Sequence, residues 1–228
     1  MYTIYYGTNN DAKINFMKNV LGALPINIIG INEIKNINHS INETGKEPLE
    51  NAKIKAWHYY RQINKPVFSA DSGLFFDNIE YQDQPGTNVR RINGKKLSDD
   101  EMIQYYSKLA EKHGGEIIGY YKNGICVIIN EKIVMEIDSD KIYSKRFILC
   151  SKPHQKINEG FPLDSLSKEI DSAKYYYDIE KIKYDNLLSY NGFKEIFVEV
   201  IEKMKIANNK IVINCYLTKL KIWNIIRL

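Results

Sequence analysis

The chain contains 228 residues, of which 44% are hydrophobic and 26% are charged, and its formal net charge is +4. This composition excludes an intrinsically disordered chain, and so balanced a charge does not favour a nucleic-acid-binding protein. Because no stretch approaches the roughly 18 consecutive apolar residues of a membrane-spanning helix, the sequence predicts a protein without a membrane segment.

The first half of the sequence alternates between short apolar runs typical of strands and longer amphipathic stretches typical of helices. The segment Asn9-Asn10-Asp11 offers N-cap side chains for the first helix, and Pro48 suits the first turn of the second. The predicted order is strand Thr3–Tyr6, helix to Leu21, strand Ile26–Ile31, polar loop Glu33–Gly45, helix Pro48–Ile63, strand Val67–Ala70, and a turn into further strand at Gly73–Phe76.

The second half predicts a meander of strands between two helices. Ser98 and Glu101 form a capping box for a helix that ends near Lys112, before two glycines. The expected strands are Ile117–Tyr121, Ile125–Ile129, Ile133–Ile137 and Tyr143–Cys150, with a turn at Lys122-Asn123-Gly124, and a late amphipathic helix is expected over Ser189–Lys205. The pattern therefore predicts a mixed α/β protein with a strand–helix half and an antiparallel half.

The common phosphate-loop, dinucleotide, zinc-protease and serine-hydrolase motifs are absent from the sequence. Three polar segments at predicted strand–helix junctions remain as candidates for a site. The first is Thr8–Lys13. Free N–H groups at a helix N-terminus can hold a phosphate, and Lys13 adds a charge one turn later. The same pattern also fits a structural role, in which Asn10 or Asp11 caps the helix and Lys13 stays in solvent.

The other two segments each carry a carboxylate. Glu43 precedes Gly45 in a loop, which is a typical position for a Mg²⁺ ligand, although the helix dipole also favours acids near a helix start. Asp71 follows a buried strand, where open α/β sheets bind ligands. A buried carboxylate there needs a metal, a substrate or a turn as its partner, and turn capping fits as well as function does.

Taken together, these segments resemble the motifs of the inosine triphosphate pyrophosphatase family, whose members hydrolyse aberrant purine nucleoside triphosphates and release pyrophosphate. Thr8–Lys13 is similar to T-G-N-x-x-K, with Asn9 in place of the glycine. The further matches are Glu43-Thr44-Gly45, Glu50-Asn51-Ala52 and Lys55-Ala56 to E-T-G…E-N-A…K-A, Ala70–Leu74 to D-D-S-G-L, and Pro85-Gly86 with Arg91 to P-G…R.

The second half of the sequence resembles the family's base-recognition segments. Gly160–Ser165 is similar to G-F-G-Y-D-P, which implies that Phe161 stacks on the base and that Asp164 supplies the motif's carboxylate. Ser189–Gly192 stands at the S-H-R-G segment that reads the purine, with Tyr190 and Asn191 in place of His and Arg. The resemblance therefore implies that neutral donors face the base, and hydrogen-bond readout is what gives a site strong discrimination.

The resemblance implies an α/β, two-lobed mixed-sheet fold with the active cleft between the lobes, and usually a homodimer. It implies that Asp71 and Lys13 are catalytic, that Asp71 orients or deprotonates the attacking water, and that Glu43 and Asp71 hold Mg²⁺. At the first Asp of the D-D motif, Ala70 removes one possible metal or base partner. The implied substrate-binding residues are Thr8, Asn10, Lys55, Ser72, Arg91, Phe161, Asp164, Tyr190 and Asn191.

The expected substrate is a (d)NTP, in particular a modified purine nucleotide such as (d)ITP or XTP, and the expected domain spans residues 1–205. An alternative is a nucleotide-binding or sensing module with little turnover, which the replaced base readers and Ala70 motivate. A nucleic-acid-binding role ranks last, because the lysines alternate with acids.

Two further expectations concern the location of the protein and its C-terminal segment. Three widely spaced cysteines and no export signal lead us to expect a cytoplasmic protein. Residues 206–228 form an extension that is compatible with an extra strand and helix, a dimer element or a poorly ordered appendage.

Overall fold

The computed structural model describes residues 1–179 and 190–225, and within the last helix it describes side chains from 191 to 208. In this part of the chain, a seven-stranded mixed sheet has the order β2-β1-β3-β6-β8-β9, and β7 also pairs with β6. The sheet contains β1 (Tyr2–Tyr6), β2 (Ile26–Gly30), β3 (Val67–Phe76), β6 (Glu116–Asn130), β7 (Ile133–Asp138), β8 (Phe147–Cys150) and β9 (Ser167–Glu169). The other elements are helices α1 (Asp11–Leu21), α2 (Pro48–Ile63), α3 (Asp99–Lys112) and α5 (Tyr190–Ile225), the ribbon β4 (Arg91–Ile92) and β5 (Lys95–Lys96), and the short 3-10 helices η1 (Ile31–Glu33), η2 (Tyr81–Asp83), η3 (Asp140–Ile142), η4 (Pro162–Leu166) and η5 (Tyr176–Asp178).

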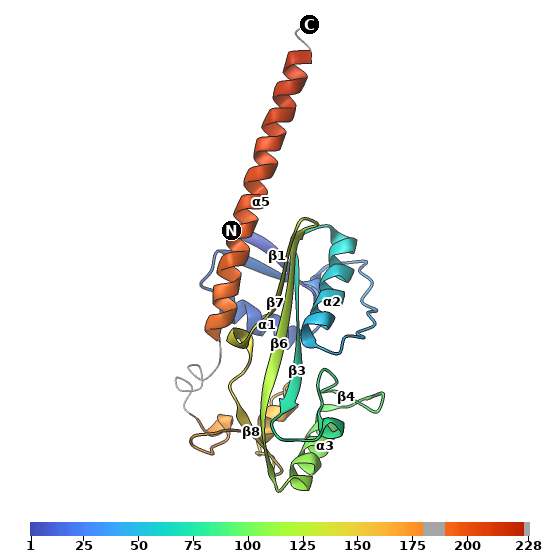
Figure 1. Ribbon diagram of the computed structural model, residues 1–228, viewed down its shortest axis with the longest axis vertical. Coiled ribbons are helices and arrows are strands. Elements are labelled where there is room, and N and C mark those ends of the chain that lie inside the picture. Colours follow the sequence, from blue (N-terminus) through green and yellow to red (C-terminus); the bar gives the residue numbers. More distant parts are fainter. Residues whose placement is uncertain (180–189, 226–228) are drawn as a thin grey trace.

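Strand β6 gives the molecule its two lobes. Its first residues, Glu116 to Gly119, pair with β8, whereas its last part, from Gly124 onward, pairs with β7. Strand β3 pairs with β6 across both parts. Figure 1 shows these two long strands running through the centre, with α1, α2 and α5 around the upper part and α3 beside the lower part. The predicted α/β fold with a two-lobed mixed sheet is confirmed.

The core is divided by the sheet into separate apolar clusters. On one face of the upper lobe, α1 and α5 pack on Phe68, and on the other face α2 packs on Val67. These neighbouring residues face opposite sides because side chains alternate along a strand. A third cluster joins α3 to β8 and η4 in the lower lobe.

The predicted helices are confirmed, together with the local signals that start them. Asn10 caps α1, and α2 has the predicted bounds, with Pro48 in its first turn. Ser98 and Glu101 form the predicted capping box of α3.

Two predicted turns are wrong, because both segments lie inside long strands. The predicted turn into further strand at Gly73–Phe76 is continuous strand, paired with residues 119–122 of β6, and the predicted turn at residues 122–124 pairs with residues 71–73 of β3. In the second segment, Gly124 does not make a turn but allows α2 to pack closely on β6. A Cβ on Gly124 would lie 2.3 Å from the backbone nitrogen of Leu49, so the start of α2 rests directly on β6.

Two predicted strand ends also need correction. Strand β2 ends at Gly30, and Ile31 begins a 3-10 helix. Strand β8 begins at Phe147 and not at Tyr143. Before this strand, Ser144 contacts Tyr121 of β6 through both its side chain and its backbone. The Ser144 hydroxyl accepts from the backbone N–H of Tyr121 at 2.7 Å, and the backbone N–H of Ser144 donates to the Tyr121 carbonyl.

The last helix is longer than predicted. Its expected first residue, Ser189, lies outside the described residues, and α5 continues past Lys205 to Ile225. Figure 1 shows that its C-terminal part extends beyond the rest of the molecule. In the described parts of the chain, no helix combines the length and the apolar character needed to cross a membrane.

Candidate functional site

Lys55 of α2 lies between two carboxylates that come from different segments. Its Nζ is 2.7 Å from Oδ1 of Asp71 on β3 and 3.3 Å from Oε2 of Glu43 in the loop before α2. The side chains of Lys55 and Asp71 are only 12% and 11% exposed, whereas Glu43 is 44% exposed. Since a buried carboxylate requires a partner, Lys55 provides the charge that Asp71 needs.

Lys13, in the first turn of α1, belongs to the same electrostatic environment. Burial lowers the pKa of Lys13, and the positive charge of Lys55 lowers it further, whereas the negative charges of Asp71 and Glu43 oppose this shift. The structure therefore brings together two lysines and two carboxylates that the sequence analysis had placed in three separate segments.

The pairing of the strands explains the position of Asp71. Strand β1 runs parallel to β3 and ends at Tyr6, after which the N–H of Gly7 still donates to the carbonyl of Phe68 at 2.8 Å. Strand β3 continues beyond this point. Asp71 was predicted to follow the end of its own strand, which is wrong, but it does lie beyond the carboxyl end of the neighbouring parallel strand, where open sheets bind ligands.

Thr8 and Asn10 fix the backbone at the start of α1. Oδ1 of Asn10 accepts from the N–H groups of Ala12 at 2.9 Å and Lys13 at 3.2 Å. Oγ1 of Thr8 accepts from the N–H of Asn10 at 3.3 Å. Asn10 therefore does have the capping role considered above, and the helix N-terminus that it caps is close to the lysine and carboxylate group.

The loop that carries Glu43 is held by residues to which the sequence analysis gave no role. Oδ1 of the buried Asn51 accepts from the N–H of Gly45 at 2.8 Å, and its Nδ2 donates to the Gly45 carbonyl at 3.3 Å. The Thr87 hydroxyl donates to the same carbonyl at 3.3 Å. Asn51 was visible in the E-N-A motif, but no sequence signal connects Thr87 to a residue 42 positions away.

The loop before η4 brings the lower lobe to the start of α1. Gly160 has a φ of +82°, and a Cβ built on it would lie 3.7 Å from that of Ala12. The Gly160 N–H donates to Oδ2 of Asp99 at 3.0 Å, and Nη1 of Arg90 donates to Oδ1 of the same carboxylate at 2.6 Å. Arg90 therefore holds this loop, whereas the predicted Arg91 is exposed on β4.

Asp164 lies in an aromatic environment of the lower lobe. Burial raises its pKa to about 6, and a hydrogen bond from Asn158 opposes the shift. The charge of Asp164 in turn adds to the effect of burial in raising the pKa values of Tyr121 and Tyr177. Phe161, three residues earlier, is half-buried.

Some predicted residues do not join the lysine and carboxylate group. Ser72 faces the opposite side of β3 from Asp71, and its Oγ donates to Oδ1 of Asn123 at 2.7 Å. Ala70 faces that same opposite side and packs on the α1 and α5 cluster. A side chain at position 70 therefore points away from Asp71, because consecutive strand residues face opposite sides of the sheet. That Ala70 removes one possible metal or base partner stays a prediction.

The start of α5 contains the predicted base readers. Asn191 is exposed, and the side chain of Tyr190 lies outside the described residues. Gly192 has a structural explanation, since a Cβ there would lie 1.9 Å from the carbonyl oxygen of Lys141 in η3.

The carboxylates fit a magnesium ion by their number and chemistry. Among the described residues, no group of three or more His, Cys, Asp or Glu side chains is arranged to hold a metal. Mg²⁺ typically takes one or two carboxylates and completes its shell with water and substrate phosphates. Glu43 and Asp71, which already converge on the single cation of Lys55, match this requirement.

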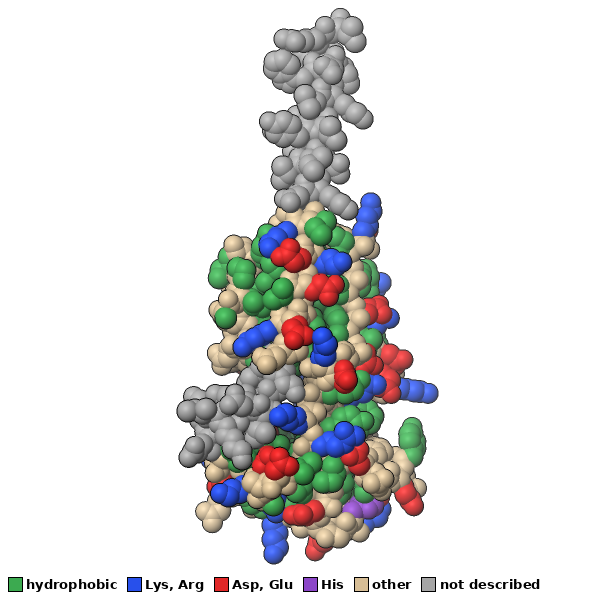
Figure 2. Space-filling view, turned by 60° about the vertical axis from the view of Figure 1, so that its left-hand side comes forward, with side chains coloured by type: hydrophobic (Ala, Val, Ile, Leu, Met, Phe, Trp, Pro, Cys, Tyr) green, Lys and Arg blue, Asp and Glu red, His purple; other side chains and the backbone are tan. Residues whose placement is uncertain are grey.

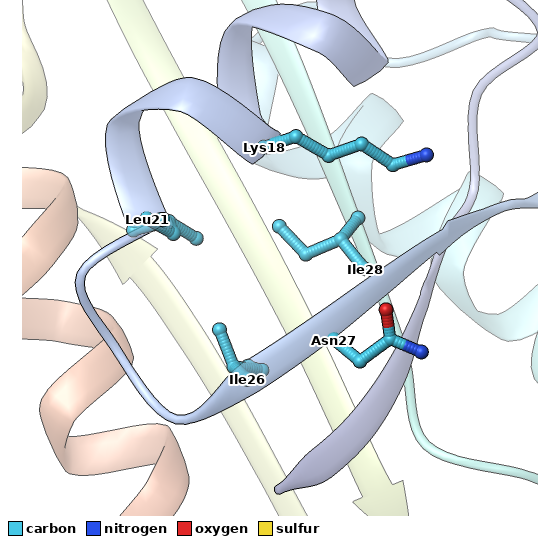
Figure 3. A pocket seen from close by; sticks show the side chains of 6 residues that line it. Lys18, Leu21, Ile26, Asn27 and Ile28 are labelled. Carbon is cyan, nitrogen blue, oxygen red and sulfur yellow. The ribbon is translucent and has the colours of Figure 1, made fainter.

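A pocket of about 310 Å³ lies elsewhere, between the end of α1 and the edge strand β2 (Figure 3). Its lining consists of Lys18, Leu21, Gly22, Ile26, Asn27 and Ile28. It shares no residue with the lysine and carboxylate group, so we assign it no part in the reaction.

Comparisons with known proteins give a consistent result. The model of the Ham1 family matches residues 4–135, which include both lysines and both carboxylates of the site. A dITP/XTP pyrophosphatase of Borreliella burgdorferi (strain ZS7) is 30% identical over 178 residues, covering 70% of this chain and 85% of that protein. Two solved structures share the fold: a HAM1 protein from Coxiella burnetii (TM-score 0.67, 22% identity, 89% of this chain and 100% of that one) and the Ham1 protein of Staphylococcus aureus (TM-score 0.65, 22% identity, 88% and 98%).

Proposed function

The chain belongs to the Ham1 family and is a hydrolase acting on triphosphate anhydrides, and we propose that it converts a nucleoside triphosphate to the monophosphate and pyrophosphate. The observation that carries this proposal is the convergence of Lys13, Lys55, Asp71 and Glu43 at the N-terminus of α1.

The two lysines and the helix N-terminus are suited to the triphosphate. Lys13 and Lys55 supply positive charge, and the backbone that Thr8 and Asn10 fix offers free N–H groups. A bound triphosphate would compete with Asp71 and Glu43 for the Lys55 ammonium group. This competition would release the two carboxylates for other ligands.

We assign Mg²⁺ to Glu43 and Asp71. The bound ion would neutralise negative charge that develops on the phosphate oxygens. Asp71 would also orient the attacking water and accept its proton, since its release from Lys55 would leave a carboxylate oxygen available to the water. The rate enhancement would come mainly from positioning and charge stabilisation.

The base lies, in this proposal, toward the lower lobe. Gly160 approaches the first turn of α1, so the adjoining Phe161 and Asp164 can face a nucleotide whose phosphates lie at that turn. Because the relative from Borreliella burgdorferi is named a dITP/XTP pyrophosphatase, we propose a modified purine nucleotide such as (d)ITP or XTP as substrate. Ser72, Arg91, Tyr190 and Asn191 remain proposed substrate contacts, and the homodimer and the cytoplasmic location remain predictions.

Release of pyrophosphate from a panel of standard and deaminated (d)NTPs with Mg²⁺ tests the proposal. We expect turnover of at least one deaminated purine nucleotide, and Asp71→Asn should lower kcat by about 100-fold or more, the typical contribution of general acid–base catalysis. Asp77→Asn is the matched control, because Asp77 follows β3 directly but pairs with Arg146 at 2.6 Å. Tight nucleotide binding without turnover of any nucleotide would instead support a binding or sensing module.

A further inference from the structure

Tyr59 is a buried residue of α2 that lies one turn after Lys55. Its side chain is 2% exposed, and its ring lies against the backbone of Gly7, where a Cβ would be 2.7 Å from Cδ2. Since residues four apart share a helix face, Tyr59 and Lys55 lie on the same side of α2. The ring therefore packs directly beneath the segment that leads to Thr8 and Asn10.

The Tyr59 hydroxyl contacts two loops that are distant in sequence. Nδ1 of His39 lies 3.4 Å from it, and the side chain of Asn9 lies near enough to favour its ionised form, which lowers the pKa of Tyr59. Burial raises the pKa of Tyr59, and the negative charge of Glu43 contributes to this shift. The hydroxyl is thus electrostatically close to one of the proposed metal ligands.

The loop of His39 is held to α2 by other bonds as well. The N–H of Asn38 donates to Oε1 of Gln62 at 2.8 Å, and the carbonyl of Asn38 accepts from Nε2 of Gln62 at 3.2 Å. His39 is therefore fixed beside Tyr59. Because His39 and Glu43 belong to the same loop, the contact between His39 and Tyr59 can help to position Glu43.

We propose that Tyr59 is a positioning residue whose hydroxyl ties the phosphate-binding segment to the loop of Glu43, an inference that rests on the proposed function. The contacts with Asn9 and with His39 both involve the Tyr59 hydroxyl oxygen, so removal of this oxygen frees both segments at once. Asn9 occupies a position where the similar T-G-N-x-x-K motif has glycine. A glycine has no side chain to offer Tyr59, so this tie depends on the residue particular to this chain.

The test is Tyr59→Phe, which keeps the ring that packs on Gly7 and removes only the hydroxyl. A hydrogen bond contributes about 0.5–1.5 kcal/mol net, which corresponds to roughly a 2- to 10-fold change in an equilibrium constant. We expect the KM for the nucleotide to rise 2- to 10-fold while kcat stays within about twofold. Binding of Mn²⁺ alone, measured by electron paramagnetic resonance, should weaken by a similar factor.

Asn9→Ala tests the other end of the tie. Asn9 is exposed, so this variant should fold even if Tyr59→Phe does not. It should raise KM as well, and the double variant should be no worse than Tyr59→Phe alone, because Tyr59→Phe already removes the contact with Asn9.

The matched control is Tyr60→Phe. Tyr60 is also buried, at 6% exposed, and its ring packs edge-to-face on Trp57 at 5.8 Å. It should leave KM and Mn²⁺ binding unchanged. The inference is overturned if Tyr59→Phe behaves like Tyr60→Phe, or if the effects of Asn9→Ala and Tyr59→Phe add fully. A wild-type protein that releases no pyrophosphate would contradict the proposed function instead, and Mn²⁺ binding would still report on the tie.

Discussion

Lys55 serves as an internal counter-ion for carboxylates that we assign to a metal. Its ammonium group contacts Asp71 and Glu43, and the pair with Asp71 is almost buried. Removal of one member of a buried ion pair is costly because the other charge stays buried without compensation. Loss of the Lys55 charge in the free protein would therefore leave Asp71 buried without a counter-ion.

Lys55→Met should lower the free energy of unfolding by roughly 3 kcal/mol in the presence of a chelator, as for other broken buried pairs. Millimolar Mg²⁺ should restore part of this loss, because the ion neutralises the same carboxylates and binds only the folded state. Urea unfolding of both proteins with chelator and with Mg²⁺ measures the difference.

Lys53→Met provides the control on the same helix. Lys53 pairs with Glu136 at 2.8 Å, but both side chains are about 40% exposed. Exposed pairs contribute about 0–1 kcal/mol, so this variant should lose little stability and gain none from Mg²⁺. An equal loss in both variants, without rescue by Mg²⁺, would show that Lys55 does not neutralise a metal site.

The residues that could be predicted from the sequence are those in compact motifs. Lys13, Glu43, Lys55 and Asp71 were named from the order and spacing of the motifs, and the structure brings them together. Thr87, Arg90 and Tyr59 were not, because each acts on a segment far away in the sequence, and a single sequence contains no signal for such contacts.

Strands β3 and β6 show the same limit at the scale of elements. The fragments Asp71-Ser72-Gly73 and Lys122-Asn123-Gly124 contain typical turn residues, yet they pair with each other inside one ladder. Ten consecutive pairs outweigh the local preference of three residues. The helices were predicted better, because their caps and periodicity are local properties.

Gly124→Ala tests the contact of α2 with this ladder. Gly124 lies opposite Asp71, and a Cβ on it would approach the backbone of Leu49 to 2.3 Å. Because backbone cannot move aside cheaply, overpacking should lower the free energy of unfolding by about 1–3 kcal/mol and displace the start of α2. Since the loop of Glu43 precedes that start, kcat/KM should fall as well, which steady-state kinetics and urea unfolding would measure.

Gly22→Ala gives the comparison for this substitution. Gly22 caps α1 with a helical φ of −59°, and the nearest backbone atom to its Cβ would be 3.1 Å away. It should change stability by less than about 1 kcal/mol and leave kcat/KM unchanged. A Gly124→Ala variant with wild-type kcat/KM would show that the position of α2 does not control the site.

At the scale of the whole molecule, the two lobes contribute different ionisable side chains to the proposed nucleotide site. The upper lobe presents two lysines with two carboxylates, and the lower lobe presents Asp164 among tyrosines. Figure 2 shows that, over the described residues of that face, blue and red side chains are interspersed on both lobes.

The half-buried carboxyl group of Asp164 makes stability depend on pH. Its pKa is raised to about 6 in the folded protein, above the value of about 3.9 in an unfolded chain. Between these values the folded state binds more protons than the unfolded state, so this group makes stability fall as pH rises from about 4 to 6. The penalty is complete above pH 6 and absent below pH 4.

Asp164→Asn removes this titration and keeps the shape of the side chain. It should therefore be more stable than wild type by on the order of 2 kcal/mol at pH 7.5, with a smaller advantage at pH 5, where the wild-type carboxyl is mostly protonated. Other titrating groups are common to both proteins and cancel in the difference. Urea unfolding at the two pH values measures it, and an advantage that is the same at both would mean that the Asp164 carboxylate is not destabilised by burial. Because the asparagine also removes the charge proposed to face the base, a gain in stability together with a higher KM would show that the lower lobe gives up stability to keep a carboxylate where the nucleotide binds.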